Sequence, residues 1–212
     1  DRGDNVNAFS QQAMRELRDV TRDFEDDLET SVVILTGSAK AFSAGFDLKD
    51  PEGRAREAAP IGEKVHRQRL GPKMSRAWEE MEPVTIAAIE GHCIGGGAAL
   101  AVSLDFRFCG RSAHFRIPEV ELGMNMSWGS LPRMIALMGP ARTKQAVILA
   151  SDRITAPEAL EWGLVEKVVD DGQALAAAMQ FAERIALQPP LPVRMTKTTI
   201  NRFTTALHAL GA

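Results

Sequence analysis

The chain of 212 residues is 45% hydrophobic and carries a formal net charge of −3 at pH 7, which suits one folded domain, or one domain with an appendage. The mixed charges provide no basic face for a polyanion, and no apolar stretch is long enough to cross a bilayer. Because the N-terminus does not resemble a secretory signal either, we expect a cytoplasmic protein that binds neither nucleic acid nor membrane.

The N-terminal part of the chain predicts a helix, a strand and a loop. Residues 9–28 place apolar side chains three and four positions apart, with charges on the other side, which predicts an amphipathic helix. Asn7 or Ser10 is suited to cap its start. Residues 31–36 are apolar and β-branched, as in a buried strand. Residues 50–62 are rich in Pro, Gly and charge, which predicts a loop or a mobile lid.

The middle of the chain predicts strands that alternate with helices. A second helix should end near Met81, and residues 84–89 repeat the pattern of a buried strand. The glycine-rich residues 91–97 lead directly into the good helix formers of residues 98–102. Residues 105–109 alternate between apolar and polar, as expected for another strand.

After Pro118 the pattern is mostly helical, with a short strand expected at residues 164–169. Helices that alternate with parallel-type strands indicate an α/β fold. The two cysteines, Cys93 and Cys109, lie in apolar surroundings without Cys or His partners at metal-ligand spacing. We therefore expect buried thiols, with no disulfide framework and no metal site.

Two glycine-rich segments, residues 40–48 and residues 91–97, each follow a predicted strand. Their small residues allow another molecule to approach the backbone, and the second segment ends at a helix N-terminus, which favours negative charge. The glycines do not have the spacing of a Rossmann fingerprint, and no Lys-Ser or Lys-Thr follows them as in a P-loop. The pattern therefore favours an anion other than a phosphate.

Four segments in order resemble the motifs of the crotonase (enoyl-CoA hydratase/isomerase) superfamily. Residues 42–48 (FSAGFDL) resemble F-x-A-G-x-D-[LI], and residues 91–97 (GHCIGGG) with Asp105 resemble G-x-x-x-G-G-G…D. Residues 117–123 (IPEVELG) resemble P-E-x-x-L-G, and residues 156–165 (APEALEWGLV) resemble A-x-E-A-x-x-x-G-L-V. The resemblance covers nearly the whole chain.

The resemblance implies an α/β fold with a crotonase-like spiral of ββα units and a helical C-terminal region, assembled as a homotrimer or a dimer of trimers. We expect residues 1–150 to form the spiral core with the acyl-CoA site, and residues 151–212 to form the helical region, with elements missing at both ends. The substrate would be an acyl-CoA thioester. Coenzyme A is then part of the substrate, and no separate cofactor is expected.

The resemblance also implies roles for main-chain groups. The N–H of Phe46 matches the first donor of an oxyanion hole, and the N–H of Gly96 matches the second. The main chain from Ala44 through Asp47 to Leu48 would hold the adenine end of coenzyme A. Fixed donors of this kind stabilise the negative charge that develops on a thioester oxygen, and the loss of one donor costs about 3–4 kcal/mol.

One carboxylate matches the acid/base residues of the family. Glu119 occupies one of the two family glutamate positions, and the other position falls on Ala99, which cannot move a proton. Glu121 is a weaker rival, because two positions along an extended segment it should face the other way. Some large apolar side chains have either a core role or a pocket role: Met74, Trp78, Met124, Met126 and Trp128.

Other polar side chains have weaker claims to a role. The histidines His66, His92 and His114 are scattered and are interpreted as hydrogen-bonded polar side chains, with His92 nearest the glycine turn. The following basic residues fit contacts with coenzyme A phosphates and a solvated face equally well: Lys49, Arg54, Arg56, Lys64 and Arg67.

The leading hypothesis is an enzyme of this family that stabilises a thioester enolate. With Glu119 as the single base, the natural reaction is isomerisation, in which a proton leaves C2 of a 3-enoyl-CoA and returns at C4, as in Δ3,Δ2-enoyl-CoA isomerases. An enoyl-CoA hydratase, another crotonase-type lyase or hydrolase, and a non-catalytic acyl-CoA-binding protein are the alternatives. The dehalogenase type is disfavoured, because residues 124–128 contain no Asp to act as nucleophile.

Overall fold

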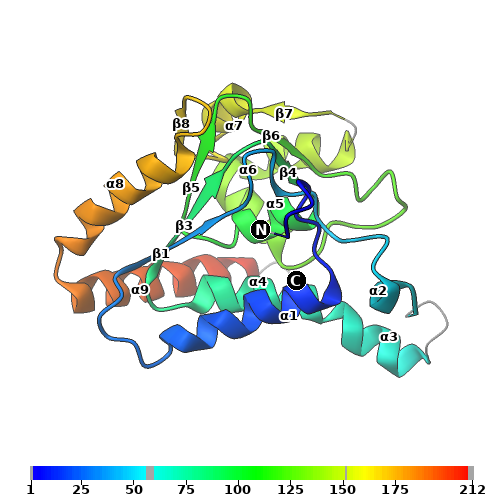
Figure 1. Ribbon diagram of the computed structural model, residues 1–212, viewed down its shortest axis with the longest axis horizontal. Coiled ribbons are helices and arrows are strands. Elements are labelled where there is room, and N and C mark those ends of the chain that lie inside the picture. Colours follow the sequence, from blue (N-terminus) through cyan, green and yellow to red (C-terminus); the bar gives the residue numbers. More distant parts are fainter. Residues whose placement is uncertain (1, 56–59, 151, 210–212) are drawn as a thin grey trace.

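The computed structural model describes residues 2–55, 60–150 and 152–209, and its strands form two four-stranded sheets (Figure 1). The first sheet is parallel and has the order β1 (Val32–Thr36), β3 (Val84–Ile89), β5 (Phe106–Gly110) and β8 (Lys167–Val169). The second has the order β2 (Ala41–Ser43), β4 (His92–Ile94), β6 (His114–Arg116) and β7 (Ile154–Thr155), and only its last pair is antiparallel.

The chain winds as a spiral, because successive strands enter the two sheets in turn. Each of the first three turns gives one strand to each sheet and then becomes helical, as in β3, β4 and the helix α5 (Gly96–Ala101). The expected ββα repeat is thereby confirmed. The strands of the second sheet were not predicted, and β2, β4 and β6 have only three residues each.

Helices cover the sheets on several sides (Figure 1). The helix α1 begins after Ser10, whose side-chain oxygen accepts from the N–H of Ala13 at 3.1 Å, so the cap is Ser10 and not Asn7. The helices are α1 (Gln11–Asp19), the 3-10 helix η1 (Val20–Phe24), α2 (Pro51–Ala55), α3 (Ile61–Gln68), α4 (Leu70–Glu80), α5, α6 (Ser130–Ile148), α7 (Ala156–Trp162), α8 (Ala174–Ala186) and α9 (Pro190–Ala209). None of them, within the described residues, is long and apolar enough to span a membrane.

Three local expectations are wrong. β1 is only half-buried, because it lies at the edge of its sheet. The loop expected at residues 50–62 holds α2 near its start and the beginning of α3 at its end, while residues 56–59 lie outside the described part of the chain. The single helix expected up to Met81 is divided into α3 and α4, which are separated by Arg69.

The core packs on both faces of the first sheet. Along β3, Ile86 and Ala88 contact the cluster that includes α8, while Ala87 and Ile89 belong to the larger core cluster on the opposite face. All of β3 is buried, so its position is fixed from both sides. Because β3 leads directly to the glycine-rich segment, this burial also fixes where that segment begins.

We expected a boundary at residue 150 between a spiral core and a helical region, but both sheets contain strands from each side of this boundary. β7 pairs with β6, and β8 pairs with β5, so strands from the second part complete sheets of the first. A spiral core of residues 1–150 with a helical region after it remains a prediction. The two long helices α8 and α9 follow these last strands.

A buried arginine joins the end of α5 to the start of β8. Arg107 is 1% exposed, and its guanidinium donates to the carbonyl of Leu104 at 2.7 Å and to that of Leu164 at 2.8 Å. It also pairs with the carboxylate of Glu166. Buried charge is tolerated only when it is paired and hydrogen-bonded, and here the donors meet acceptors from three segments.

Replacing Arg107 by Met is expected to lower the free energy of unfolding by about 3 kcal/mol, because two carbonyls and Glu166 lose their partner. Urea denaturation measures the change. The control is Arg111→Met, which removes an exposed pair with Asp170 and should cost at most about 0.5 kcal/mol. Equal effects of the two substitutions would contradict the structural role of Arg107.

Candidate active site

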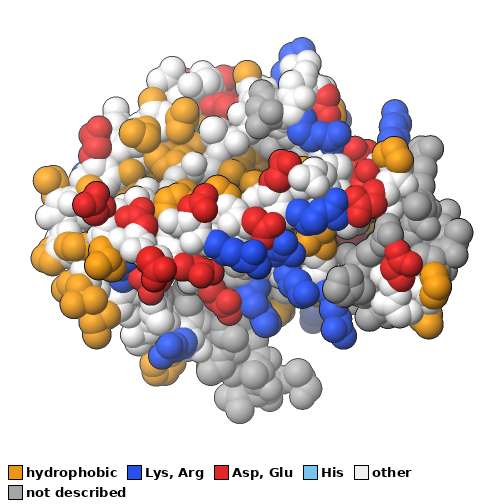
Figure 2. Space-filling view, turned by 60° about the horizontal axis from the view of Figure 1, so that its bottom comes forward, with side chains coloured by type: hydrophobic (Ala, Val, Ile, Leu, Met, Phe, Trp, Pro, Cys, Tyr) orange, Lys and Arg blue, Asp and Glu red, His pale blue; other side chains and the backbone are white. Residues whose placement is uncertain are grey.

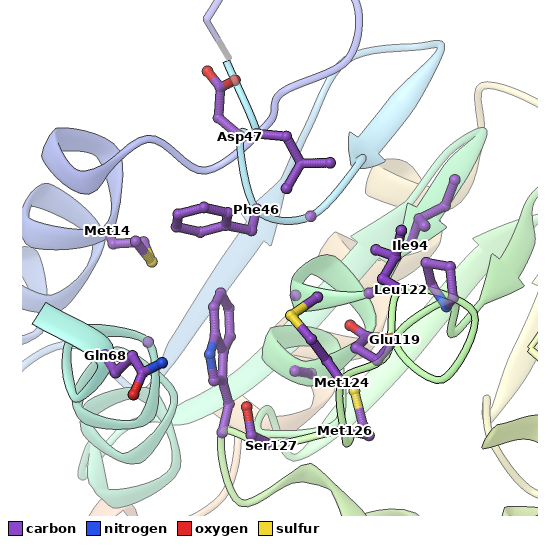
Figure 3. Close-up of a pocket in the computed structure, with 18 of the residues that line it drawn as sticks. Met14, Phe46, Asp47, Gln68, Ile94, Glu119, Leu122, Met124, Met126 and Ser127 are labelled. Carbon is purple, nitrogen blue, oxygen red and sulfur yellow. The ribbon is translucent and has the colours of Figure 1, made fainter. Parts of the chain in front are cut away.

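A cavity of about 750 Å³ opens beside the start of α5 (Figure 3). Its lining comes from segments that are far apart in the sequence, including α1, the loop after β2, the glycine-rich segment and the segment after β6. All the site residues expected from the sequence line it: Ala44, Phe46, Asp47, Leu48, Gly96, Glu119 and Trp128. The fold therefore brings these residues together in one place.

A β-bridge between Phe9 and Phe46 orients the N–H of Phe46 toward the glycine-rich segment. Phe9 donates its N–H to the carbonyl of Gly45 at 2.6 Å and accepts from the N–H of Asp47 at 3.0 Å. Because successive peptide groups of extended backbone alternate in direction, the N–H of Phe46 points away from Phe9. Gly45 has φ +84°, and a Cβ on it would lie only 3.0 Å from the nitrogen of Gly96. Glycine at this position permits the close approach of the two segments.

The N–H of Gly96 lies on the first turn of α5, where the helix provides no acceptor for it. The nitrogen of Phe46 lies 3.5 Å from where a Cβ of Gly96 would stand. Neither N–H takes part in a hydrogen bond with another residue in the part of the chain that the structure describes. Two unpaired donors at the positive end of a helix form a cradle for an oxygen that gains negative charge.

Glu119 places a carboxylate beside this cradle. Its Oε1 lies 2.8 Å from where a Cβ of Gly95 would stand, so only glycine leaves room for it. Its Oε2 is buried and has no hydrogen-bond partner among the described residues. Burial raises the pKa of Glu119, and a hydrogen bond from its own backbone opposes this in part. A carboxylate held in this way accepts a proton more readily than one in water.

The rival groups lie elsewhere or cannot transfer a proton. Glu121 is exposed and pairs with Arg116 at 2.5 Å. We expected an extended segment to turn this side chain away from Glu119, but residues 119–123 form a turn instead. Ala99 lines the cavity and is 1% exposed. The Nδ1 of His92 lies 2.9 Å from the Nε2 of His114, across two strands of the second sheet. Both rings are outside the cavity lining, so neither acts on its contents.

Trp128 forms a wall of the cavity in a strained backbone conformation. Its φ is +61°, which is uncommon for any residue except glycine. The indole lies so close to two glycines that a Cβ on Gly71 would be 2.1 Å from it and a Cβ on Gly96 would be 2.6 Å from it. It also stacks on Phe9, with ring centroids 6.3 Å apart. Trp128 therefore contacts both α4 and the start of α5.

The other large apolar side chains divide between cavity and core. Met124 and Met126 line the cavity, which agrees with the pocket role considered for them. Met74 and Trp78 belong to the core instead, where the indole N–H of Trp78 donates to a main-chain carbonyl of α1 at 2.8 Å. The sequence did not single out several further lining residues: Gln11, Met14, Gln68, Ile94 and Leu122.

Asp47 uses its carboxylate to hold the loop in place. It pairs with Arg2 at 2.9 Å and accepts from the N–H of Lys49 at 2.9 Å, and the hydrogen bond from Arg2 is the main cause of its lowered pKa. Lys49 is exposed. Arg56 lies outside the described residues, as do the side chains of Arg54, Lys64, His66 and Arg67.

The two cysteines are buried and unpaired, as expected. Burial raises the pKa of both thiols, to about 12 for Cys109, so neither acts as a thiolate nucleophile near neutral pH. Within the described ranges, no group of three or more His, Cys, Asp and Glu side chains has the geometry of a metal site. The acidic side chains that line the cavity are Asp47, which is paired with Arg2, and Glu119, whose raised pKa and unpartnered Oε2 suit proton transfer.

Comparison with known proteins gives one consistent result. Residues 1–210 match the protein family described as Enoyl-CoA hydratase/isomerase. The short-chain-enoyl-CoA hydratase of Clostridium acetobutylicum is 36% identical over 199 residues, which is 93% of this chain and 74% of that protein. The crotonyl-CoA hydratase of Syntrophomonas wolfei is 36% identical over 198 residues, or 92% of this chain and 74% of that one. The crystal structure of an enoyl-CoA hydratase from Bacillus anthracis aligns with a TM-score of 0.86 at 33% identity, covering 94% of this chain and 76% of that one.

Replacing Glu119 by Gln is expected to raise the midpoint of thermal unfolding at pH 7 and to leave it almost unchanged at about pH 3.5. The folded state holds the proton of Glu119 more tightly than the unfolded state does. As the pH rises above the ordinary value of 4.5, the unfolded state therefore loses its proton first. The parent protein loses stability from there up to the raised pKa of the folded state, and the amide variant does not. Calorimetry at both pH values measures the difference, and an equal difference at both would show that burial does not affect this carboxyl.

Proposed function

Since the chain belongs to the enoyl-CoA hydratase/isomerase family, we propose that it moves the double bond of a 3-enoyl-CoA to the 2-position, with Glu119 as its single proton carrier. The observation that carries this proposal is the pairing, within the described residues, of two main-chain donors that lack an acceptor with the half-buried carboxylate of Glu119, whose Oε2 has no hydrogen-bond partner. These are the groups that a reaction through a thioester enolate requires.

The cradle would receive the thioester carbonyl oxygen. Removal of a proton from C2 places negative charge on this oxygen, and the N–H groups of Phe46 and Gly96 are already oriented toward it. Donors fixed by the fold need no reorganisation as the charge develops, so they stabilise the enolate more than the substrate. The main chain at Ala44 and Leu48, which also line the cavity, would hold coenzyme A.

Glu119 would move one proton between two carbons. Its carboxylate takes a proton from C2, the electron pair forms the C2–C3 double bond as the C3–C4 double bond opens, and the carboxyl returns the proton at C4. The raised pKa suits both halves of this cycle, because the group must accept and then release a proton near neutral pH. No water takes part, which agrees with an Ala at position 99, where a second carboxylate would face the same cavity.

Hydration of a 2-enoyl-CoA is the second candidate function. The relatives from Clostridium acetobutylicum and Syntrophomonas wolfei are both named as hydratases, which favours this reaction. In this chain a water molecule would have to be held without a carboxylate at position 99. Neutral polar side chains that line the cavity and are able to hold it are Gln11, Gln68, Asn125 and Ser127.

We also propose that copies of the chain associate as a homotrimer or a dimer of trimers. Figure 2 shows apolar side chains that gather at the left end of the face in view, and α8 and α9 meet at this end in Figure 1. Leu187 and Leu191 at this junction are 83% and 65% exposed. Exposed apolar side chains that cluster in this way support a protein interface. Sedimentation equilibrium measures the assembly directly.

Replacing Glu119 by Gln is expected to lower the rate of isomerisation by about 10² or more while acyl-CoA affinity is kept, because the amide preserves the shape and removes the base. The assay incubates the protein with 3-enoyl-CoA in heavy water and follows both 2-enoyl-CoA and deuterium at C2. Glu121→Gln is the control, since this side chain is exposed and paired outside the cavity. A larger loss in the control than in Glu119→Gln would show that the wrong base has been assigned.

Replacing Ala99 by Glu is expected to introduce or increase the addition of water to 2-enoyl-CoA, because two carboxylates divide the activation of water and the delivery of the C2 proton. Ala99 is almost fully buried, so overpacking is expected to cost about 1–3 kcal/mol of stability, which urea denaturation measures in parallel. If the parent hydrates as fast as the folded variant, hydration is its own activity and another group performs this role.

A further inference from the structure

Gln11 places an unpaired amide in the wall of the cavity. It lies on α1, is 2% exposed and lines the cavity. Its backbone N–H donates to Asp50 at 2.9 Å, but its side-chain amide has no hydrogen bond to any residue that the structure describes. Unlike the Oε2 of Glu119, this amide is not sealed from solvent, so a polar group that enters the cavity can bond to it.

The surroundings of this amide form a compartment away from the catalytic carboxylate. Met14 lies one turn along α1 from Gln11, and Gln68 ends α3 on the same side of the cavity (Figure 3). Figure 3 shows these two side chains across the cavity from Glu119. The indole of Trp128 contacts Gly71 beside this compartment and Gly96 beside the cradle. The cradle and Gln11 line the same cavity, so an acyl chain whose carbonyl is in the cradle can extend along the indole toward Gln11.

The chemistry of the wall restricts what the compartment accepts. Met14 and Pro72 are apolar, so a hydrocarbon chain fits beside them. The amide of Gln11 both donates and accepts hydrogen bonds, which suits a hydroxyl or a carbonyl oxygen. The nearby carboxylate of Asp50, which is 9% exposed, disfavours a second negative charge. A neutral oxygen therefore fits better than a carboxylate.

We propose that the enzyme acts on acyl-CoA thioesters whose acyl group carries a neutral oxygen, a hydroxyl or a carbonyl, at its far end, and that Gln11 binds this oxygen. This inference rests on the proposed function, because it places the thioester carbonyl between Phe46 and Gly96. It adds a substrate class and a specificity-determining residue. Gln68, at the same side of the compartment, provides a second amide within the wall.

The test uses pairs of 3-enoyl-CoA substrates of equal length, one ending in a methyl group and the other in a hydroxymethyl group, across several chain lengths. At the best length, kcat/KM for the hydroxylated substrate should exceed that for its partner by about tenfold, as one well-placed neutral hydrogen bond provides. Gln11→Met, which keeps the length of the side chain, should reduce this ratio to about one. Gln11→Asn, which withdraws the amide from the cavity, should reduce it as well.

The neighbouring Gln12 provides a matched control on the same helix. Its side chain is exposed and donates to Glu16 at 2.7 Å, so Gln12→Met should leave the ratio of the parent unchanged. A parent ratio near one at every length, or an equal ratio in the parent and both Gln11 variants, would overturn the inference. The amide would then hold only water.

Calorimetry with saturated acyl-CoA pairs, which need no turnover, separates this inference from the proposed function. Tighter binding of the hydroxylated thioester that is lost in Gln11→Met supports the compartment even if no double bond moves, in which case only the proposed reaction fails. Turnover of 3-enoyl-CoA without any preference, together with equal binding of both thioesters, leaves the proposed reaction standing and refutes the role of Gln11.

Discussion

The site depends on two backbone segments that approach each other without a side chain between them. Gly45 and Gly96 meet where a Cβ on either would collide with the opposite segment or with Trp128, and Gly97 lies equally close to the main chain of Ser43. This approach fixes the start of α5 against the loop after β2 and leaves two N–H groups without acceptors among the described residues. The bridge to Phe9 and the spiral of paired strands hold both segments at this distance.

Buried charged side chains are more fully hydrogen-bonded in the scaffold than in the cavity. Lys197 of α9 pairs with Asp105 at 2.7 Å, and Asp105 also accepts from the N–H of Thr85 at 2.7 Å, so the aspartate of the glycine-rich motif ties β3, β5 and α9 together. Arg107 is equally well satisfied. Glu119, by contrast, has one oxygen without a partner in the part of the chain that the structure describes. The hydrogen bonds of the scaffold thus fix its elements against one another, while the carboxylate in the cavity is not held in this way by any described side chain.

The sequence predicted the features that depend on local pattern, and it missed those that depend on stacking. Buried β-branched runs identified β3, and the resemblance of the glycine-rich segments to crotonase motifs pointed to the two N–H groups of the cradle. The three-residue strands β2, β4 and β6 have no pattern of their own, because they exist through pairing between successive turns. The backbone of Trp128 is also set by tertiary packing against glycines, and the amide of Gln11 reads in sequence as an ordinary helix residue.

A cradle made of peptide groups has an evolutionary consequence. Any point mutation other than one to proline leaves the peptide N–H in place, so most substitutions at position 46 do not remove the donor that this residue provides. The carboxylate of Glu119, in contrast, is lost by a single codon change. One substitution at position 119 can therefore remove the carboxylate from the cavity, whereas the main-chain donors persist through most substitutions.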